Sequence, residues 1–82
     1  ARLEAWIRQN RGEDRAAVAA YARALTKEPS DAMSWNNLAN IHAKVGNTDR
    51  AIAAFENAIT HAPGEVLIYL NLADVLRAAD RG

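Results

Sequence analysis

Primary amides are the side chains of this sequence whose type and spacing best suit a recognition chemistry. Asn37 and Asn71 lie 34 residues apart, and Asn40 follows Asn37 by about one helical turn. A primary amide carries two N–H donors and one carbonyl acceptor, so it can hydrogen-bond to a peptide N–H and a peptide C=O at once. These asparagines therefore favour binding of a polypeptide backbone over bond-making chemistry.

The residues that catalysis or metal binding would need form no recognisable pattern. His42 and His61 fall on different predicted helices, without the His and Glu spacing of a helical metal site. Ser30 and Ser34 lie at a helix start with no base in a matching motif. The four glycines are not clustered, and there is no cysteine. We therefore expect no catalytic residue, no metal site and no cofactor, with His42 as a half-buried packing residue.

The charge balance argues against two classes of partner. Ten basic and ten acidic residues give a formal net charge of zero, whereas nucleic acids and anionic membranes both need a basic face. Every purely apolar run in the sequence, Val66 to Leu70 among them, is far shorter than the roughly 20 residues that span a bilayer. Nucleic acid and membrane are therefore not expected as partners, and a cytoplasmic location is the expectation because a chain without cysteine fits a reducing compartment.

The sequence repeats with a period of 34 residues, and each unit contains two predicted helices. The shifted chain aligns Gly12 with Gly46, Tyr21 with Phe55, Pro29 with Pro63, Trp35 with Tyr69 and Asn37 with Asn71. Apolar residues recur at spacings of three and four, which is the pattern of amphipathic helices. Asp31 is a candidate N-cap and Gly46 a candidate helix stop. The predicted helices cover about 1–11, 14–28, 31–45, 48–61 and 65–79.

This pattern resembles the tetratricopeptide repeat, whose signature is W-x2-L-G-x2-Y, then A-x3-F, then P. Ala replaces the signature Gly and His42 the signature Tyr, while Glu4 and Arg8 replace packing residues in the first helix. The resemblance implies an all-α solenoid of antiparallel helix pairs with five helices. One array over 1–82 would contain a first unit at about 1–31 with a degenerate first helix, a second at about 32–65 and a half unit at about 66–82. The central unit carries the signature at Trp35, Leu38, Ala39, His42, Ala51, Phe55 and Pro63.

The resemblance also implies a function, because the first helices of successive tetratricopeptide units line a concave groove. A row of asparagines there resembles the asparagine ladder of the O-linked N-acetylglucosamine transferases. The expected role is a non-catalytic protein–protein interaction scaffold, and the asparagines could instead bond within their own stack. One alternative is an arm of a larger bacterial enzyme, such as a glycosyltransferase or sulfotransferase. The predicted groove residues are Asn36, Asn37, Asn40, Lys44, Asn71, Asp74 and Arg77.

The last predicted helix is apolar around most of its circumference in its first turns. A helix of this kind is normally buried, and exposed apolar patches mark interfaces. We expect the chain to be a fragment of a longer array whose next helix covers this surface. Homo-oligomerisation through the same helix is the other alternative. The surface in question is predicted at Leu67, Ile68 and Leu70.

Overall fold

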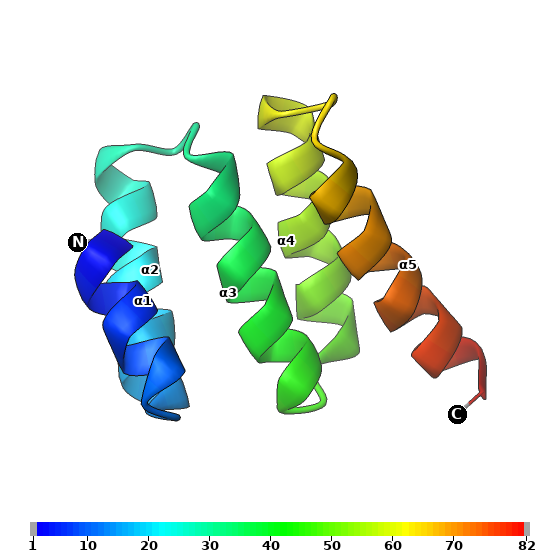
Figure 1. Ribbon diagram of the computed structural model, residues 1–82, viewed down its shortest axis with the longest axis horizontal. Coiled ribbons are helices and arrows are strands. Elements are labelled where there is room, and N and C mark those ends of the chain that lie inside the picture. The colour runs from blue at the N-terminus through cyan, green and yellow to red at the C-terminus, as the bar shows by residue number, and fades with distance from the viewer. Residues whose placement is uncertain (1, 82) are drawn as a thin grey trace.

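The computed structural model describes residues 2–81, and these residues form five α-helices (Figure 1). Their bounds lie close to the predicted ranges, and the largest difference is at the end of the last helix, which reaches Arg81. The predicted all-α architecture is therefore confirmed. The helices are α1 (Arg2–Asn10), α2 (Asp14–Lys27), α3 (Ala32–Lys44), α4 (Thr48–His61) and α5 (Val66–Arg81).

A glycine reverses the chain within each of the first two units. Gly12 and Gly46 have φ angles of 76° and 89°, a left-handed conformation that costs glycine little because it has no Cβ. Each belongs to a Schellman motif, in which two N–H groups satisfy the free carbonyls of the preceding helix. The outer bonds run from Glu13 N–H to Arg8 O at 2.9 Å and from Asn47 N–H to His42 O at 2.8 Å. The two turns are therefore the same structure repeated.

The turns between units also repeat, and each is held by an aromatic side chain. Trp35 Nε1 donates to the Pro29 carbonyl at 2.8 Å, and the Tyr69 hydroxyl donates to the Pro63 carbonyl at 2.7 Å. Asp31 caps α3 as predicted, since its carboxylate accepts from the Ser34 hydroxyl at 2.8 Å and faces the Ser34 N–H at 3.5 Å. Asn47 stands at the N-cap of α4 but makes no side-chain cap bond.

The core consists of two clusters on either side of α3, in which small alanines alternate with a few large side chains. Trp35 packs against both clusters and so joins them. Because alanine adds little bulk, the helix backbones approach closely and the large residues fill the space that remains. The first cluster contains Ala5, Ala17, Ala20, Tyr21, Leu25, Leu38 and Ile41, and the second contains Ala39, Ala51, Ala54, Phe55, Ala58 and Ile68.

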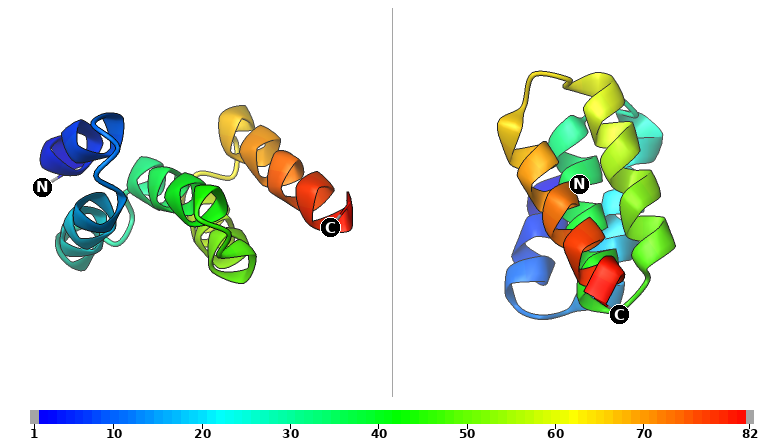
Figure 2. Two further views of the ribbon diagram at one scale, coloured as in Figure 1. Left: turned by 90° about the horizontal axis from the view of Figure 1, so that it is seen from below. Right: turned by 90° about the vertical axis from the view of Figure 1, so that its right-hand side faces the viewer.

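The helices form two rows. Figure 2 (left) shows α1, α3 and α5 along one side of the molecule and α2 and α4 along the other. The central helix α3 contacts each of the other four helices, whereas α1 and α5 do not contact each other. We call the side formed by α1, α3 and α5 the open face, and it is the side that Figure 1 presents to the viewer. Across the described helices, none combines the length and the apolar character needed to cross a membrane.

The prediction that Ile68 lies on an exposed surface of the last helix is wrong. Ile68 is fully buried in the second cluster, where Leu72 and Val75 of the same helix pack beside it. These positions form one stripe at spacings of four and three, and α5 lays this stripe against α4. Leu67 and Leu70, in contrast, are exposed as expected.

Candidate functional site

The open face contains two hollows, one on each side of α3. The hollow between α1 and α3 has a volume of about 720 Å³, and the hollow between α3 and α5 has a volume of about 350 Å³. Asn37 lines the first. The second is lined by four predicted groove residues, namely Asn40, Lys44, Asn71 and Asp74. Most of the predicted groove residues are therefore brought to this face.

The hollow between α1 and α3 has mixed walls and a floor at the end of α2. Its apolar walls are Leu3, Trp6 and Met33, and its polar walls include Lys27 and Glu28. Trp6 is 52% exposed, an unusual exposure for so large an aromatic ring. Leu3 is not among the predicted groove residues, although the repeat points to it, because Leu3 precedes Asn37 by one period of 34 residues.

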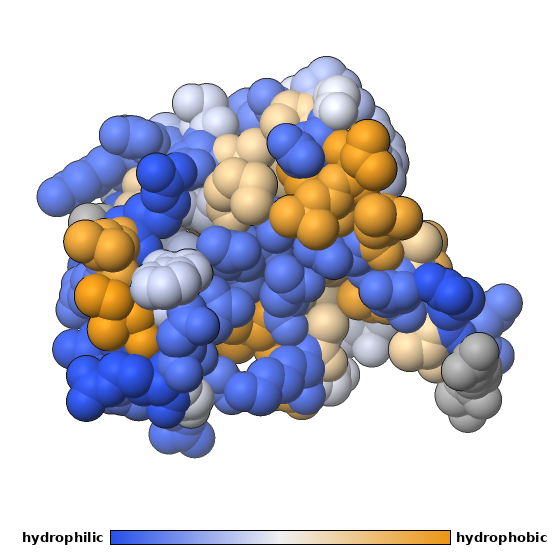
Figure 3. Space-filling model, viewed as in Figure 1, coloured by the Kyte–Doolittle hydropathy of each residue, from blue (hydrophilic) through white to orange (hydrophobic). Residues whose placement is uncertain are grey.

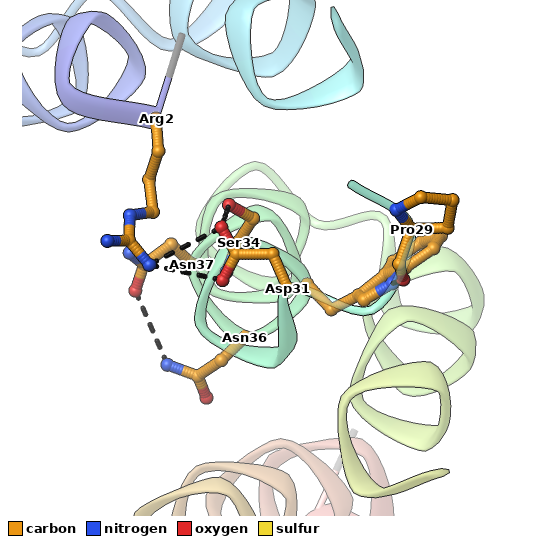
Figure 4. A network of polar contacts seen from close by, with 7 residues as sticks. Arg2, Pro29, Asp31, Ser34, Asn36 and Asn37 are labelled. Atoms are coloured by element: carbon orange, nitrogen blue, oxygen red, sulfur yellow. Dashed lines mark hydrogen bonds and ion pairs between the residues drawn. The ribbon is translucent and has the colours of Figure 1, made fainter. Parts of the chain in front are cut away.

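An ion pair forms part of the lining of this hollow. Arg2 of α1 lies 3.2 Å from the carboxylate of Asp31, the residue that caps α3. Figure 4 shows this pair beside Asn37. Because Arg2 remains largely exposed, the pair contributes at most about 1 kcal/mol to stability. Its main effect is to fix the position of the Asp31 carboxylate at the edge of the hollow.

The charged residues near the second hollow are also paired. Lys44 Nζ lies 3.3 Å from a carboxylate oxygen of Asp14 on α2. Arg77 pairs with Asp74 one turn earlier on α5, and both side chains are exposed. Arg77 lines neither hollow, so this predicted groove residue lies apart from the four that line the second hollow.

Three amide side chains form a hydrogen-bonded chain from α5 to α3. Asn71 Nδ2 donates to Asn36 Oδ1 at 3.0 Å, and Asn36 Nδ2 donates to Asn37 Oδ1 at 3.3 Å. Figure 4 shows the bond between Asn36 and Asn37. The Asn37 amide also lies beside the hydroxyl of Tyr21. Burial raises the pKa of this hydroxyl, and the amide opposes that shift only in part. The asparagines therefore do bond to one another within the helical stack, which was the alternative to ligand binding.

The prediction that Asn36 belongs to the exposed groove is wrong, because this residue is only 1% exposed. It is buried where α5 approaches α3, and the amide chain compensates for the loss of water. A signal was available in the sequence. That signal was mixed, because the equivalent residue is the apolar Leu70 one period later but the charged Arg2 one period earlier.

His42 is half-buried, as predicted, and its Nδ1 atom is buried without a hydrogen-bond partner among the residues from 2 to 81. Burial lowers the pKa of this imidazole below its ordinary value of 6.5, and the positive charge of Arg50 lowers it further. The folded protein therefore favours the neutral ring. This environment suits a packing residue that replaces an aromatic ring.

The buried imidazole predicts a loss of stability at mildly acidic pH. At His42 the unfolded chain binds a proton more tightly than the folded protein does, so the free energy of unfolding falls as the pH drops below 6.5. The decrease should level off once the pH is below the lower pKa of the folded state. Urea unfolding followed by circular dichroism between pH 8 and pH 5 should show this slope in the parent, and His42→Phe should flatten it.

The control for this experiment is His61→Phe, because His61 is exposed in the last turn of α4. This variant should keep the slope of the parent. Equal slopes in the parent and in His42→Phe would show that the buried ring does not govern the acid sensitivity.

Comparison with known families agrees with this repeated geometry. A family model described as a tetratricopeptide repeat matches residues 2–44, more than half of the chain, and a second such model matches residues 32–65. The chain belongs to the tetratricopeptide repeat family. Tetratricopeptide repeats generally mediate protein–protein interactions and are typically non-catalytic. A comparison with curated proteins finds no match.

The first helix departs most from the tetratricopeptide signature, and the residues that replace the signature there have a structural role. Glu4 and Arg8 stand where packing residues are expected, and they form an ion-pair network instead. Arg8 lies 3.3 Å from Glu4 and 3.2 Å from Glu13, and Arg23 of α2 lies 3.3 Å from Glu4. The hydrogen bond from Arg8, followed by that from Arg23, lowers the pKa of the Glu4 carboxyl. These ion pairs link α1 to α2 and to the turn that precedes α2.

Proposed function

We propose that this chain is a non-catalytic tetratricopeptide module whose open face binds an extended peptide segment of a partner protein. The observation that carries the proposal is the placement of two equivalent asparagines at the two hollows. Asn37 uses its carbonyl to accept from Asn36, which leaves amide N–H capacity toward the first hollow. Asn71 uses its amide to donate to Asn36, which leaves carbonyl capacity toward the second.

These two asparagines suit opposite groups of a peptide backbone. A remaining N–H of Asn37 can donate to a peptide carbonyl, and the Asn71 carbonyl can accept from a peptide N–H. Neither bond depends on the side chains of the ligand, so many sequences could be accommodated. Because Asn36 holds both amides in place, less conformational entropy is lost when a ligand binds.

The proposal predicts that Asn37→Ala weakens peptide binding without unfolding the protein. The probe is a synthetic peptide enriched on the intact chain from a phage-displayed random dodecapeptide library, and its affinity is measured by fluorescence anisotropy. Loss of one backbone hydrogen bond should raise Kd about five- to tenfold. The melting temperature should fall by only about 4–8 °C, the effect of about 1 kcal/mol, because Asn37 is itself half-buried but its loss leaves one N–H of the buried Asn36 amide without its acceptor.

Asn57→Ala supplies the matched control. Asn57 is an exposed asparagine of α4, on the opposite row of helices, and its amide bonds to the Ala53 carbonyl at 3.0 Å. This variant should bind the peptide as the parent does. Unchanged affinity in Asn37→Ala, or unfolding of this variant at the temperature of the titration, would contradict a role of Asn37 in ligand binding.

Self-association through α5 is the second candidate, and the exposure of Tyr69 and Leu76 favours it. These residues correspond to Trp35 and His42, which lie on the side of α3 that faces α4. A second copy of the chain could cover the same side of α5. Static light scattering would detect the dimer, and Leu76→Glu should then restore the monomer. A parent that is monomeric at 100 µM would remove this candidate.

A further inference from the structure

Apolar side chains lie at both ends of the open face, with amides between them. In Figure 3 the hydrophobic colour gathers over α1 and over the first turns of α5, while the middle of the face is hydrophilic. At the α1 end, Leu3, Trp6 and Met33 line the first hollow. At the α5 end, Leu67 occupies the position that Met33 has one period earlier, and it is 45% exposed. We call Leu3, Trp6 and Met33 the α1 anchor site, and we call Leu67 the α5 anchor site.

Most of the charges around this face neutralise one another in pairs, and the two remaining charged walls of the first hollow, Lys27 and Glu28, have opposite signs. Three basic side chains each lie against a carboxylate of the same protein, and the chain as a whole has zero formal charge. Such a surface offers little long-range field to attract a charged ligand. The ligand between the anchors is therefore expected to carry little net charge. The pairs are Arg2 with Asp31, Lys44 with Asp14 and Arg77 with Asp74.

The packing of the helices sets the separation of the two anchor sites. Neighbouring packed helices lie about 8–10 Å apart, and the α1 anchor site lies between α1 and α3 whereas Leu67 stands on α5. Because α3 contacts α1 and α5 much less than it contacts α4, the upper value applies, and the sites are separated by about one and a half helix spacings, or roughly 15 Å. An extended chain rises about 3.3 Å per residue and alternates its side chains between two faces. Two side chains that point into the same face at this separation lie about four residues apart.

We propose that the open face selects an extended, largely uncharged peptide segment with two apolar side chains about four residues apart. One side chain enters the hollow at Trp6, and the other packs on Leu67. The intervening backbone then passes Asn37 and Asn71, which supply the hydrogen bonds described above. This proposal rests on the proposed function and adds the chemical class of the ligand to it.

An amphipathic helix with the same residue spacing does not fit. In an α-helix, two residues four apart are separated by only about 6 Å along the axis, because the rise is about 1.5 Å per residue. That length is less than half of the separation between the anchor sites. Proline between the anchors distinguishes the two forms, since it breaks a helix but is compatible with an extended chain.

The experiment selects peptides on the intact chain from the random dodecapeptide library and tests the enriched peptides in synthetic form. The enriched peptides should share two apolar residues about four apart, and removal of either should weaken binding about tenfold. A central proline should be tolerated, and affinity should change less than about threefold between 50 and 500 mM NaCl. Leu67→Ser should weaken the two-anchor peptide about tenfold. Val45→Ser, at an apolar residue of similar exposure (52%) that lines neither hollow, should leave affinity within about twofold.

The possible results separate this inference from the proposed function. If no peptide is enriched, both are overturned. Peptides with one apolar residue, with a charged motif, or with affinity unchanged by Leu67→Ser would overturn the two-anchor ligand and leave the binding face in place. A parent that is dimeric by light scattering, and monomeric as Leu67→Ser, would show that a second copy covers the α5 anchor site, which also overturns the inference.

Discussion

Phe55→Ala is expected to leave the chain largely unfolded at 25 °C. Phe55 is fully buried in the second cluster, and truncation of a core phenylalanine to alanine costs about 3–5 kcal/mol. Small domains have little stability in reserve, because they bury a smaller fraction of their surface than large ones do and total stabilities start near 5 kcal/mol. The loss is therefore comparable with the entire free energy of unfolding.

The surroundings of Phe55 place this variant at the upper end of that range. Its buried neighbours include Ala39, Ala51 and Ala58, and alanines have no side chain that could rotate into the space left by the ring. The cavity would persist, and the cost of a core truncation rises with the volume that fails to collapse. Far-ultraviolet circular dichroism should show loss of most of the helical signal in Phe55→Ala.

Phe55→Leu is the control for this prediction. Leucine keeps most of the apolar volume, so the free energy of unfolding should fall by only about 1–2 kcal/mol and the helical signal should remain. If Phe55→Ala instead melted within about 5 °C of the parent, the second cluster would not be the main stabilising contact between α3, α4 and α5.

The turns, caps and repeat of this fold could be predicted from the sequence because their causes are local. Gly46 reverses the chain since it accepts a positive φ, and Asp31 caps α3 through a residue three positions away. The aromatic residues at Trp35 and Tyr69 reach prolines six residues earlier. Each of these interactions spans less than one repeat, so one unit of sequence contains the information for it.

The burial of individual positions on α1, α3 and α5 could not be predicted in the same way. Periodicity identifies the side of a helix that faces its neighbour in the same unit, but α3 is also covered from the side by α5. Asn36 is buried by that lateral contact, and Ile68 is buried where α5 meets the preceding unit. These contacts depend on the angle between successive units, which the pattern within one helix does not encode. The same angle determines where the hollows open, so only part of the candidate site was identified.

Asn36→Ala is expected to destabilise the protein more than Asn37→Ala does. The change removes a buried acceptor from Asn71 and a buried donor from Asn37 and leaves a cavity between α3 and α5. An unsatisfied buried polar group costs about 1–3 kcal/mol. A total loss near 2 kcal/mol would lower the melting temperature by about 8–16 °C in a domain of this size.

A double variant tests whether the cost comes from unpaired amides or from lost volume. Asn36→Leu places at this position the residue that the next unit has at Leu70, but it leaves the Asn71 amide without its acceptor. Asn36→Leu combined with Asn71→Leu removes both partners of that bond, a change that can be nearly neutral when the shape is kept. The double variant should therefore melt higher than Asn36→Leu alone. Melting temperatures that simply add would show that the two amides do not interact.

The amide chain affects both stability and ligand binding. Variants of it can therefore show whether Asn36 positions the other two amides for binding or is purely structural. If Asn36 positions Asn37 and Asn71, the double leucine variant should stay folded and yet bind the library-selected peptide more weakly than Asn37→Ala does, since it loses one backbone contact and the support of the other. A purely structural Asn36 would give a double variant that loses no more affinity than Asn71→Leu alone. Anisotropy titrations of these three variants, at a temperature where each is folded, distinguish the two roles.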